Sequence, residues 1–314
     1  MLQKYGELDL LVSGTQSELN LPYTVRYRCK GASFVYNRKG GIDYLKSITH
    51  NFSSRLYREI ASLPVKRYDL IVNDFEPVSA WAARIRGVPC VALGHQAAFR
   101  SPLTPRPPEQ DPLGEWILKN YAPANSGIGF HFERYEDYIY PPVIRKDIRD
   151  AAVGDKGHYT VYLPAFNERR LLSLLANFPE VDWQVFSRYT RREVQQGNVW
   201  LRRVDAQAFT ESFLNCRGIL TGAGFETPAE ALYMGKKLFV VPIKGQYEQY
   251  CNAAALERLG VTVAYKVKEN FPLLLHNWIR EDQALHMAFT DMTEEAIARA
   301  FDWHKTSYPR PVVV

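Results

Sequence analysis

The sequence has few of the features that mark secreted, membrane-spanning or metal-bound proteins. Its 314 residues contain only four cysteines, scattered without close pairing, so neither a disulfide framework nor a cysteine metal site is predicted. No apolar run approaches the ~20 residues that a membrane-spanning helix requires, and no signal-peptide pattern is visible. We therefore expect a cytoplasmic protein in which Cys90 and Cys216, which lie in apolar runs, are buried.

The chain also lacks short internal repeats and low-complexity tracts, and its composition is that of an ordinary globular protein. Hydrophobic residues make up 46% of it and charged residues 23%. Because a single hydrophobic core stops growing at about 250–300 residues, this length favours two domains.

Short apolar segments alternate with segments of helical periodicity along most of the chain. In the first half we predict strands at residues 8–13, 68–73 and 89–93, and helices at 44–63 and 78–86. The second half repeats the scheme, with predicted strands at residues 159–164, 183–186, 199–204, 218–221, 237–242 and 261–265. Such alternation is typical of parallel, doubly wound α/β sheets.

A proline pair separates the two halves. Pro141 and Pro142 lie in the segment YIYPPVIR, where they remove backbone donors and favour an extended linker. We therefore predict a first domain at residues 1–140 and a second at 141–289. Residues 290–314 contain a last helix, whose acidic start and basic end suit the helix dipole.

The formal net charge of +5 is a mild excess that favours anionic ligands or surfaces. Part of it gathers near the start of the chain, where basic residues alternate with aromatic ones. These residues are Arg26, Arg28, Lys30, Arg38, Lys39, Tyr23, Tyr27, Phe34 and Tyr36. Such a segment suits a peripheral contact with the inner membrane face or a phosphorylated acceptor, and a solvated loop with aromatic anchors equally well. No nucleic-acid motif is present, so no nucleic-acid partner is expected.

Residues 219–252 are the most informative part of the sequence. They predict a buried strand, a turn at Gly222-Ala223-Gly224, and a helix opened by Thr227 as N-cap, with Glu230 closing a capping box. A helix N-terminus behind a turn without side chains offers N–H groups and a positive dipole to phosphate. The following strand ends before Glu248, Gln249 and Asn252, at the edge where parallel sheets bind ligands.

This order of residues resembles the donor-binding motif of nucleotide-sugar glycosyltransferases with the GT-B fold. The closest comparisons are the N-acetylglucosaminyl transferase of peptidoglycan synthesis and the plant secondary-metabolite transferases. Many plant members carry a histidine where Gly222 stands, which favours bacterial and archaeal relatives of the peptidoglycan enzyme.

The resemblance implies a role for each donor-side residue. It assigns the diphosphate to Gly222, Ala223 and Gly224 at the start of the helix that holds Thr227. It assigns the ribose to Glu230, and the sugar to Glu248 and Gln249, with Asn252 closing the motif. Read singly, Glu230 could only cap its helix, the glycines could only shape the turn, and Gln249 could be a solvated helix-start residue.

The resemblance also implies the architecture: two Rossmann-like domains facing a cleft, with the last helix returning to the first domain. A GT-B first domain normally opens with a strand, a glycine-rich loop and a helix, and residues 1–7 resemble only the end of that helix. We therefore expect a first domain that is incomplete at its amino terminus. No Asp-x-Asp motif is seen, so no metal or other cofactor is expected.

Three polar clusters follow predicted strands of the first domain and should face the cleft: residues 13–15, 73–77 and 94–96. A transferase needs a base for the acceptor hydroxyl, and His95, Asp74 and Glu76 are the candidates. His95 could instead be a hydrogen-bonded loop histidine, and Asp74 could cap the helix that follows it.

We therefore predict an inverting, metal-independent glycosyltransferase that moves a sugar from a nucleotide diphosphate, most simply of the UDP type, to an unknown hydroxyl acceptor. A lipid-linked acceptor is one candidate. Two alternatives remain: a nucleotide-sugar epimerase on the same fold, which needs carboxylates such as Glu76 or Glu248 around the sugar, and a non-catalytic nucleotide-sugar-binding protein.

Overall fold

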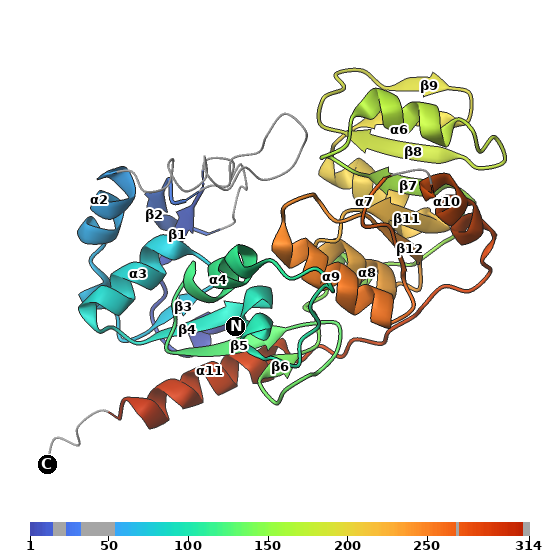
Figure 1. Ribbon diagram of the computed structural model, residues 1–314. Helices are drawn as coiled ribbons and strands as arrows, with labels where there is room; N and C mark the ends of the chain where they lie inside the picture. The colour runs from blue at the N-terminus through green and yellow to red at the C-terminus, as the bar shows by residue number, and fades with distance from the viewer. Residues whose placement is uncertain (15–22, 33–53, 268–269, 310–314) are drawn as a thin grey trace, which may run out of the picture.

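The computed structural model describes residues 1–14, 23–32, 54–267 and 270–309. These residues form a mixed α/β structure with one parallel or mainly parallel sheet in each half and a separate two-stranded sheet (Figure 1). The predicted helix at 44–63 is described only from Ser54, and Thr15, Phe34, Tyr36, Arg38 and Lys39 lie outside the described residues. The predicted α/β class with two Rossmann-like units is confirmed.

The first half contains a four-stranded parallel sheet with the order β3-β4-β5-β6. Its strands are β3 (Ile71–Asn73), β4 (Cys90–Gly94), β5 (Ser126–Phe130) and β6 (Ile139–Tyr140). A separate parallel pair joins β1 (Leu10–Ser13) and β2 (Val25–Cys29). Within the described part of the chain β1 pairs with β2 alone, and β3 is the edge of its own sheet.

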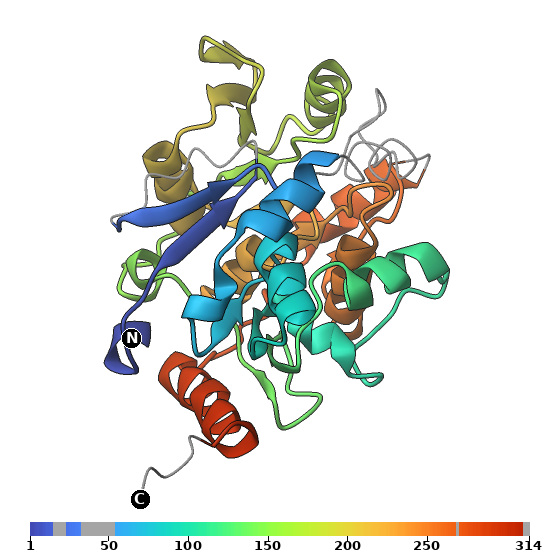
Figure 2. The same cartoon turned by 90° about the vertical axis from the view of Figure 1, so that its left-hand side faces the viewer.

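Helices flank this half on the side seen in Figure 2. They are α2 (Ser54–Ser62), α3 (Pro77–Arg86), α4 (Pro112–Asn120) and the 3₁₀ helices η2 (Val65–Arg67) and η3 (His95–Arg100). The 3₁₀ helix η1 (Leu2–Lys4) lies apart from them, beside the last helix of the chain. The apolar face of α3 supplies Val78, Ala82 and Ala83 to a core shared with α2. Gly87 ends α3 with a left-handed φ of 66°, where glycine is favoured.

The second half contains a seven-stranded sheet with the order β13-β12-β11-β7-β8-β10-β9. Its strands are β7 (Tyr159–Tyr162), β8 (Trp183–Ser187), β9 (Val194–Gln196), β10 (Val199–Arg203), β11 (Gly218–Thr221), β12 (Lys237–Val240) and β13 (Thr262–Val263). All neighbours are parallel except β9, which runs antiparallel to β10. The helices are α5 (Lys146–Arg149), α6 (Glu168–Leu175), α7 (Ala206–Asn215), α8 (Glu226–Tyr233), α9 (Tyr247–Arg258) and α10 (Phe271–Arg280). Apolar clusters cover both faces of the sheet, as a doubly wound sheet requires.

The last helix, α11 (Thr293–Ser307), packs against the first sheet (Figure 1). Ala296 and Ala300 are buried among Val91 of β4 and Ile128 of β5. Tyr5 of the amino-terminal segment stacks on Phe301 at 4.2 Å between ring centroids. The helix thus contacts the first half, while the domain boundaries at 140 and 289 stay predictions.

Several elements differ from the sequence-based prediction. Residues 25–29 form a strand in which Arg26 and Arg28 are exposed and Tyr27 is half-buried, an alternation hidden in the basic and aromatic composition. The strands β5 and β6 were not predicted, and β6 lies in the segment that was taken as a linker. Cys90 and Cys216 are buried, as expected.

Candidate functional site

The predicted glycine turn joins β11 to α8, where the carboxyl end of a central strand meets a helix. Ala223 is fully buried, whereas Gly224 borders open space, since no atom lies within 4 Å of the position that a Cβ would occupy. Neither Gly222 nor Gly224 has a left-handed φ, so backbone conformation does not require glycine at either position. At Gly224 the missing side chain therefore leaves room beside the helix N-terminus.

The helix α8 begins at Glu226, with Phe225 as its N-cap and no side-chain cap. The predicted capping box is therefore wrong: Thr227 lies inside the first turn, half-buried, and Glu230 faces elsewhere. A capping box needs an extended N-cap residue, but Phe225 is in the right-handed helical region. The first N–H groups of α8, like those of every helix, have no intrahelical partner, and no side chain of the N-cap residue accepts from them here.

The Glu230 carboxylate pairs with Arg145, which lies just before α5. Arg145 Nε donates to Glu230 Oε1 at 2.6 Å and Nη2 donates to Oε2 at 3.3 Å. The Glu230 side chain is 6% exposed and that of Arg145 is 48% exposed. Burial raises the pKa of Glu230, and the guanidinium opposes that rise. Glu230 is thus a buried carboxylate that a half-exposed arginine covers.

At the start of α9, Glu248 and Gln249 lie beside the same turn. Gln96 Nε2 of η3 donates to the Glu248 carboxylate at 3.2 and 3.3 Å, which links the two halves. Gln249 Oε1 accepts from the backbone N–H of Ile243 at 2.9 Å and lies 3.5 Å from the position of a Cβ on Gly222. Gln249 therefore supports the loop between β12 and α9 and borders the glycine turn.

Asn252 is fully buried and connects His95 to the glycine turn. Its Nδ2 donates to the carbonyl oxygen of Ala223 at 3.1 Å, and its Oδ1 lies 2.8 Å from His95 Nε2. His95 Nδ1 lies 2.9 Å from the carbonyl oxygen of Phe130. Burial lowers the pKa of His95, against the effect of Glu248 and these hydrogen bonds. Each ring nitrogen of His95 thus faces an oxygen acceptor within the protein.

Asp74 follows β3 and reaches the same region with an exposed side chain. Desolvation by the surrounding protein raises the pKa of Asp74, and the charges of Glu226 and Glu248 add to the rise. A Cβ on Gly94 would lie 2.1 Å from Asp74 Oδ1, so the glycine leaves room for this carboxylate. The next residue, Phe75, has a φ of 49°, an uncommon value that is more frequent at functional sites.

Glu76 is the N-cap of α3, a place that the sequence offered to Asp74. Its carboxylate accepts from the N–H groups of Val78 at 2.8 Å and Ser79 at 2.6 Å, and also from the Ser79 hydroxyl at 2.6 Å. Asn73 holds the backbone of Glu76 from the other side. These contacts direct the Glu76 carboxylate into its own helix.

Two residues of this region carried no signal in the sequence. Arg145 lies in the segment that the proline pair marks as a linker, and no local pattern indicates its partner Glu230, 85 positions away. Phe225 stacks on the His95 ring at 3.8 Å with an interplanar angle of 7°. Phe225 directly follows the glycine turn, and no local pattern marks it as a ring partner of His95.

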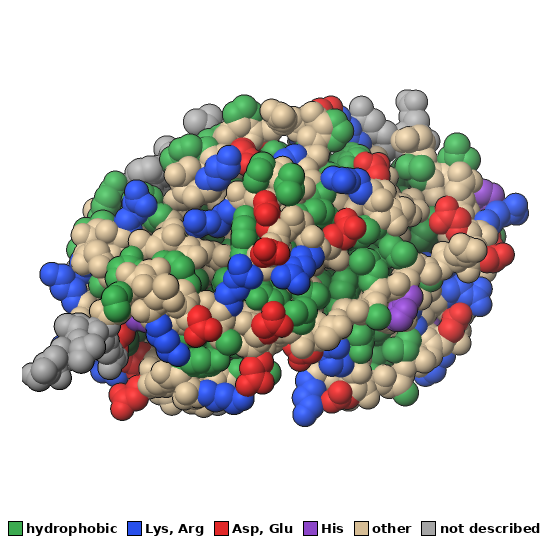
Figure 3. All heavy atoms as spheres, turned by 90° about the horizontal axis from the view of Figure 1, so that it is seen from below, with side chains coloured by type: hydrophobic (Ala, Val, Ile, Leu, Met, Phe, Trp, Pro, Cys, Tyr) green, Lys and Arg blue, Asp and Glu red, His purple; other side chains and the backbone are tan. Residues whose placement is uncertain are grey.

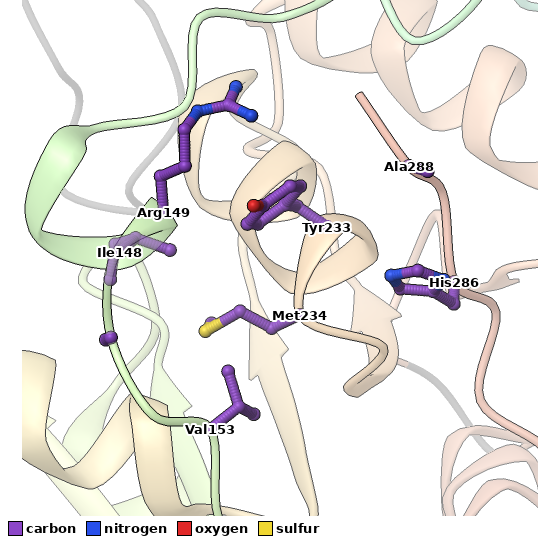
Figure 4. Close-up of a pocket in the computed structure, with 8 residues that line it drawn as sticks. Ile148, Arg149, Val153, Tyr233, Met234, His286 and Ala288 are labelled. Atoms are coloured by element: carbon purple, nitrogen blue, oxygen red, sulfur yellow. The ribbon is translucent and has the colours of Figure 1, made fainter. Parts of the chain in front are cut away.

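A cavity of about 360 Å³ lies at the other end of α8 (Figure 4). Its lining residues are Ile148, Arg149, Ala151, Val153, Tyr233, Met234, His286 and Ala288. None of the predicted donor-binding residues borders it. The cavity is therefore separate from the glycine turn, which meets the opposite end of the helix.

Charged side chains of both signs are interspersed on the face shown in Figure 3. In the described ranges no helix combines the length and apolarity needed to cross a bilayer. The same ranges contain no group of three or more His, Cys, Asp or Glu side chains arranged to hold a metal ion.

Comparisons with known proteins agree with this geometry. The family model for glycosyl transferase family 1 matches residues 27–279. A search of curated proteins found no significant sequence match. Among solved structures, the chain is similar to UGT89C1 of Arabidopsis thaliana complexed with UDP-L-rhamnose, with 12% identity and a TM-score of 0.58 over 98% of this chain and 93% of that one.

Two further structures share the fold. Os79 from O. sativa, in complex with U2F and trichothecene, has 14% identity and a TM-score of 0.55 over 97% of this chain and 89% of that one. The glycosyltransferase of kitacinnamycin has 16% identity and a TM-score of 0.52 over 90% and 82%. At these identities the likeness concerns the fold, and the family model assigns the family. The chain belongs to glycosyl transferase family 1 and is a glycosyltransferase with the GT-B fold.

Proposed function

We propose that this glycosyltransferase takes its sugar from a UDP-type nucleotide sugar bound at the β11–α8 turn. The open space at Gly224 and the N-terminus of α8 suit the diphosphate, whose negative charge the helix dipole would stabilise. Glu230 lies on the same helix, where its carboxylate could accept the ribose hydroxyls. Glu248 and Gln249 start the next helix and border the turn on the side that we assign to the sugar.

One observation carries the proposal: candidates from both halves of the chain lie around a single turn. Gln96 of the first half donates to Glu248 of the second, and His95 meets Asn252. The Asp74 carboxylate is close enough to Glu226 and Glu248 for their charges to raise its pKa. Transfer of a sugar from donor to acceptor requires a base on the acceptor side and an anion site on the donor side.

In the proposed mechanism Asp74 is the base. Its raised pKa makes it a stronger base than an ordinary carboxylate, and its side chain is exposed to an incoming acceptor. The acceptor hydroxyl loses its proton to Asp74 as its oxygen forms a bond to the anomeric carbon. The bond from that carbon to the diphosphate breaks, and the leaving charge meets the N–H groups of α8. A single displacement inverts the anomeric centre.

The contacts of the other two base candidates favour different roles. Glu76 caps α3, and both ring nitrogens of the buried His95 are held by protein oxygens, so neither group is open to an acceptor hydroxyl. We assign the base to Asp74 on this ground.

The finer parts of the proposal concern the acceptor and the domains. The complex of one structural relative, UGT89C1, with UDP-L-rhamnose supports a UDP-type donor. We propose kinship with bacterial and archaeal relatives of the peptidoglycan enzyme and a lipid-linked acceptor, with Arg26 and Arg28 on the exposed face of β2 as a contact for an anionic membrane. We also propose the division into residues 1–140, 141–289 and 290–314.

The test is product analysis with a panel of UDP-sugars and an acceptor mixture that includes polyprenyl-linked sugars, in the presence of EDTA. We expect a glycosylated product with an inverted anomeric configuration, detected by NMR. UDP-GlcNAc incubated alone should stay unchanged, because appearance of its C2 epimer would indicate an epimerase. Donor binding without any product across the panel would favour the non-catalytic alternative.

A further inference from the structure

His95 is the one candidate of the acceptor side that reaches into the glycine turn itself. It sits at the carboxyl end of β4, and its ring contacts three segments that are distant in sequence. These are Phe130 at the end of β5, Asn252 on α9 and Phe225 at the start of α8. The side chain is 6% exposed, so all of these contacts are interior.

We propose that His95 and Asn252 are positioning residues that hold the β11–α8 turn in place for the donor diphosphate from the opposite sheet. The inference rests on the proposed function, because it assumes that the diphosphate binds at this turn. Neither residue touches the reacting atoms in this inference. The sequence suggested His95 as a base and Asn252 as a donor-binding residue, and both roles are replaced here by positioning of the turn.

Asn252 and His95 contact the residues on either side of Gly224 in the turn. On one side Asn252 Nδ2 binds the carbonyl oxygen of Ala223 at 3.1 Å. On the other side the His95 ring stacks on Phe225, 3.8 Å away and nearly parallel. Gly224 between them borders open space. The protein therefore fixes the flanks of the turn and leaves its middle accessible, as an anion site built from backbone N–H groups needs.

The same strand end also sets the position of the proposed base. Gly94 precedes His95 and makes room for the Asp74 carboxylate, 2.1 Å from the position of a Cβ. Gly94, the last residue of β4, thus makes room for the proposed base, and His95, the first residue of η3, contacts the turn that binds the leaving group. We infer that this arrangement fixes the spacing between Asp74 and the diphosphate, a spacing on which the rate of an oriented reaction depends strongly.

The hydrogen-bond partners of His95 determine which protonation state of its ring completes both contacts. The Phe130 carbonyl can only accept, so His95 Nδ1 must carry a hydrogen. Asn252 uses its amide N–H on Ala223 and presents its oxygen to His95 Nε2, so that nitrogen must also donate. Both contacts are complete only when His95 is an imidazolium ion.

The charges around His95 determine when that ion forms. Glu248 of α9, with Oε1 3.9 Å from Nε2, and Glu226 of α8 favour it. Burial opposes it, and the basic group beside the ring is His131 after β5, 5.1 Å away between ring centroids, on which Arg106 in turn acts. Burial lowers the pKa of His95 and so favours the neutral ring, in which one of the two contacts is incomplete. A diphosphate at the turn adds negative charge nearby, so we expect donor binding to be accompanied by proton uptake at His95.

The experiment compares His95→Gln, Asn252→Ala and the double variant with wild type in the full-length chain. Donor KM should rise several-fold in each single variant, since each loses the His95–Asn252 hydrogen bond and one further contact. The double variant should show little further loss, because both residues act through one chain of contacts. His158→Gln is the matched control: His158 is also buried, bonded to Ser212, and remote from the turn. It should lower the melting temperature without changing donor KM.

A second measurement tests whether UDP binding is accompanied by proton uptake at His95. UDP titrated into wild-type protein at pH 6.0–6.5, in two buffers of different ionisation enthalpy, should show proton uptake that is lost in His95→Gln. Three results would each overturn the inference. The first is an additive loss in the double variant. The others are a donor KM in His95→Gln equal to that in His158→Gln, and proton uptake in His95→Gln equal to that in wild type. If wild type binds no nucleotide, the proposed function itself fails; if it binds UDP and the histidine variant behaves like its control, the positioning role alone fails.

Discussion

The guanidinium of Arg145 covers the carboxylate of Glu230 through two hydrogen bonds of 2.6 and 3.3 Å. The two residues are 85 positions apart, and they join the segment before α5 to the helix behind the glycine turn. A ribose that binds Glu230 must share this carboxylate with Arg145 or displace the arginine, since the Glu230 side chain is only 6% exposed.

We predict that Glu230→Ala weakens UDP binding by ~1.5–3 kcal/mol, the value of hydrogen bonds to a charged group. Isothermal titration calorimetry measures this change, and Asp147→Ala is the control, because Asp147 contacts Arg145 at 3.3 Å without touching Glu230. Unchanged UDP affinity in Glu230→Ala with a lowered melting temperature would assign Glu230 to the ion pair alone.

Gln249→Ala should affect the binding of UDP-sugar more than the binding of UDP. Gln249 borders the glycine turn from the next helix, on the side that we assign to the sugar. We therefore expect the variant to bind UDP-sugar several-fold more weakly, because it loses a hydrogen bond of about 0.5–1.5 kcal/mol. Its affinity for UDP should stay almost unchanged. The variant also loses the contact with Ile243, so its melting temperature must be measured in parallel. Equal losses for both ligands would place Gln249 at the phosphates or in the loop support.

Asp74→Asn should lower kcat by roughly 100-fold or more, with donor binding retained, because a general base contributes about that factor. The base must be ionised, and the pKa of Asp74 is raised from its ordinary value of 3.8. Activity of wild type should therefore fall with decreasing pH through a limb that lies above pH 3.8. The variant should lack this limb. A wild-type kcat in Asp74→Asn would move the base elsewhere.

Two buried histidines to which we assign no contact with the donor, His131 and His158, predict how the free energy of unfolding depends on pH. Burial lowers the pKa of both, and that of His131 lies well below its usual 6.5. The unfolded chain therefore binds more protons than the folded one as the pH falls below 6.5, and the free energy of unfolding should decrease. Urea denaturation at pH 7.5 and 5.5 measures the difference. His131→Asn should reduce the slope, and an equal slope in wild type and variant would refute the assignment.

The sequence was sufficient for features that depend on local patterns. The apolar runs of β7, β11 and β12 are fully or nearly fully buried strands, and the glycine turn lies at the end of β11 as predicted. The strand β5 was missed because it contains Gly127 and Gly129, which weaken the pattern of a strand. A Cβ on Gly129 would lie 2.7 Å from the backbone of Ala98, so close packing of η3 explains the glycine.

Partnerships between distant residues could not be predicted in this way. The capping box at Thr227 and Glu230 matched a local rule, yet the helix begins earlier and Glu230 turns to Arg145. Glu76 replaced Asp74 as the cap of α3, a shift of two residues that side-chain reach decides. The His95–Asn252 contact spans 157 positions and follows only from the way the two sheets face each other.

The central claim is that the donor diphosphate binds in the space beside Gly224. Calorimetric titration of UDP into wild type and Gly224→Val tests it most directly, because the added side chain enters that space without meeting protein atoms at its Cβ and without a left-handed backbone. We predict that wild type binds UDP, and that the variant keeps its melting temperature but binds UDP at least ten times more weakly. Equal UDP affinity in both proteins, or no binding of UDP, dTDP or GDP species by folded wild type, would contradict the account.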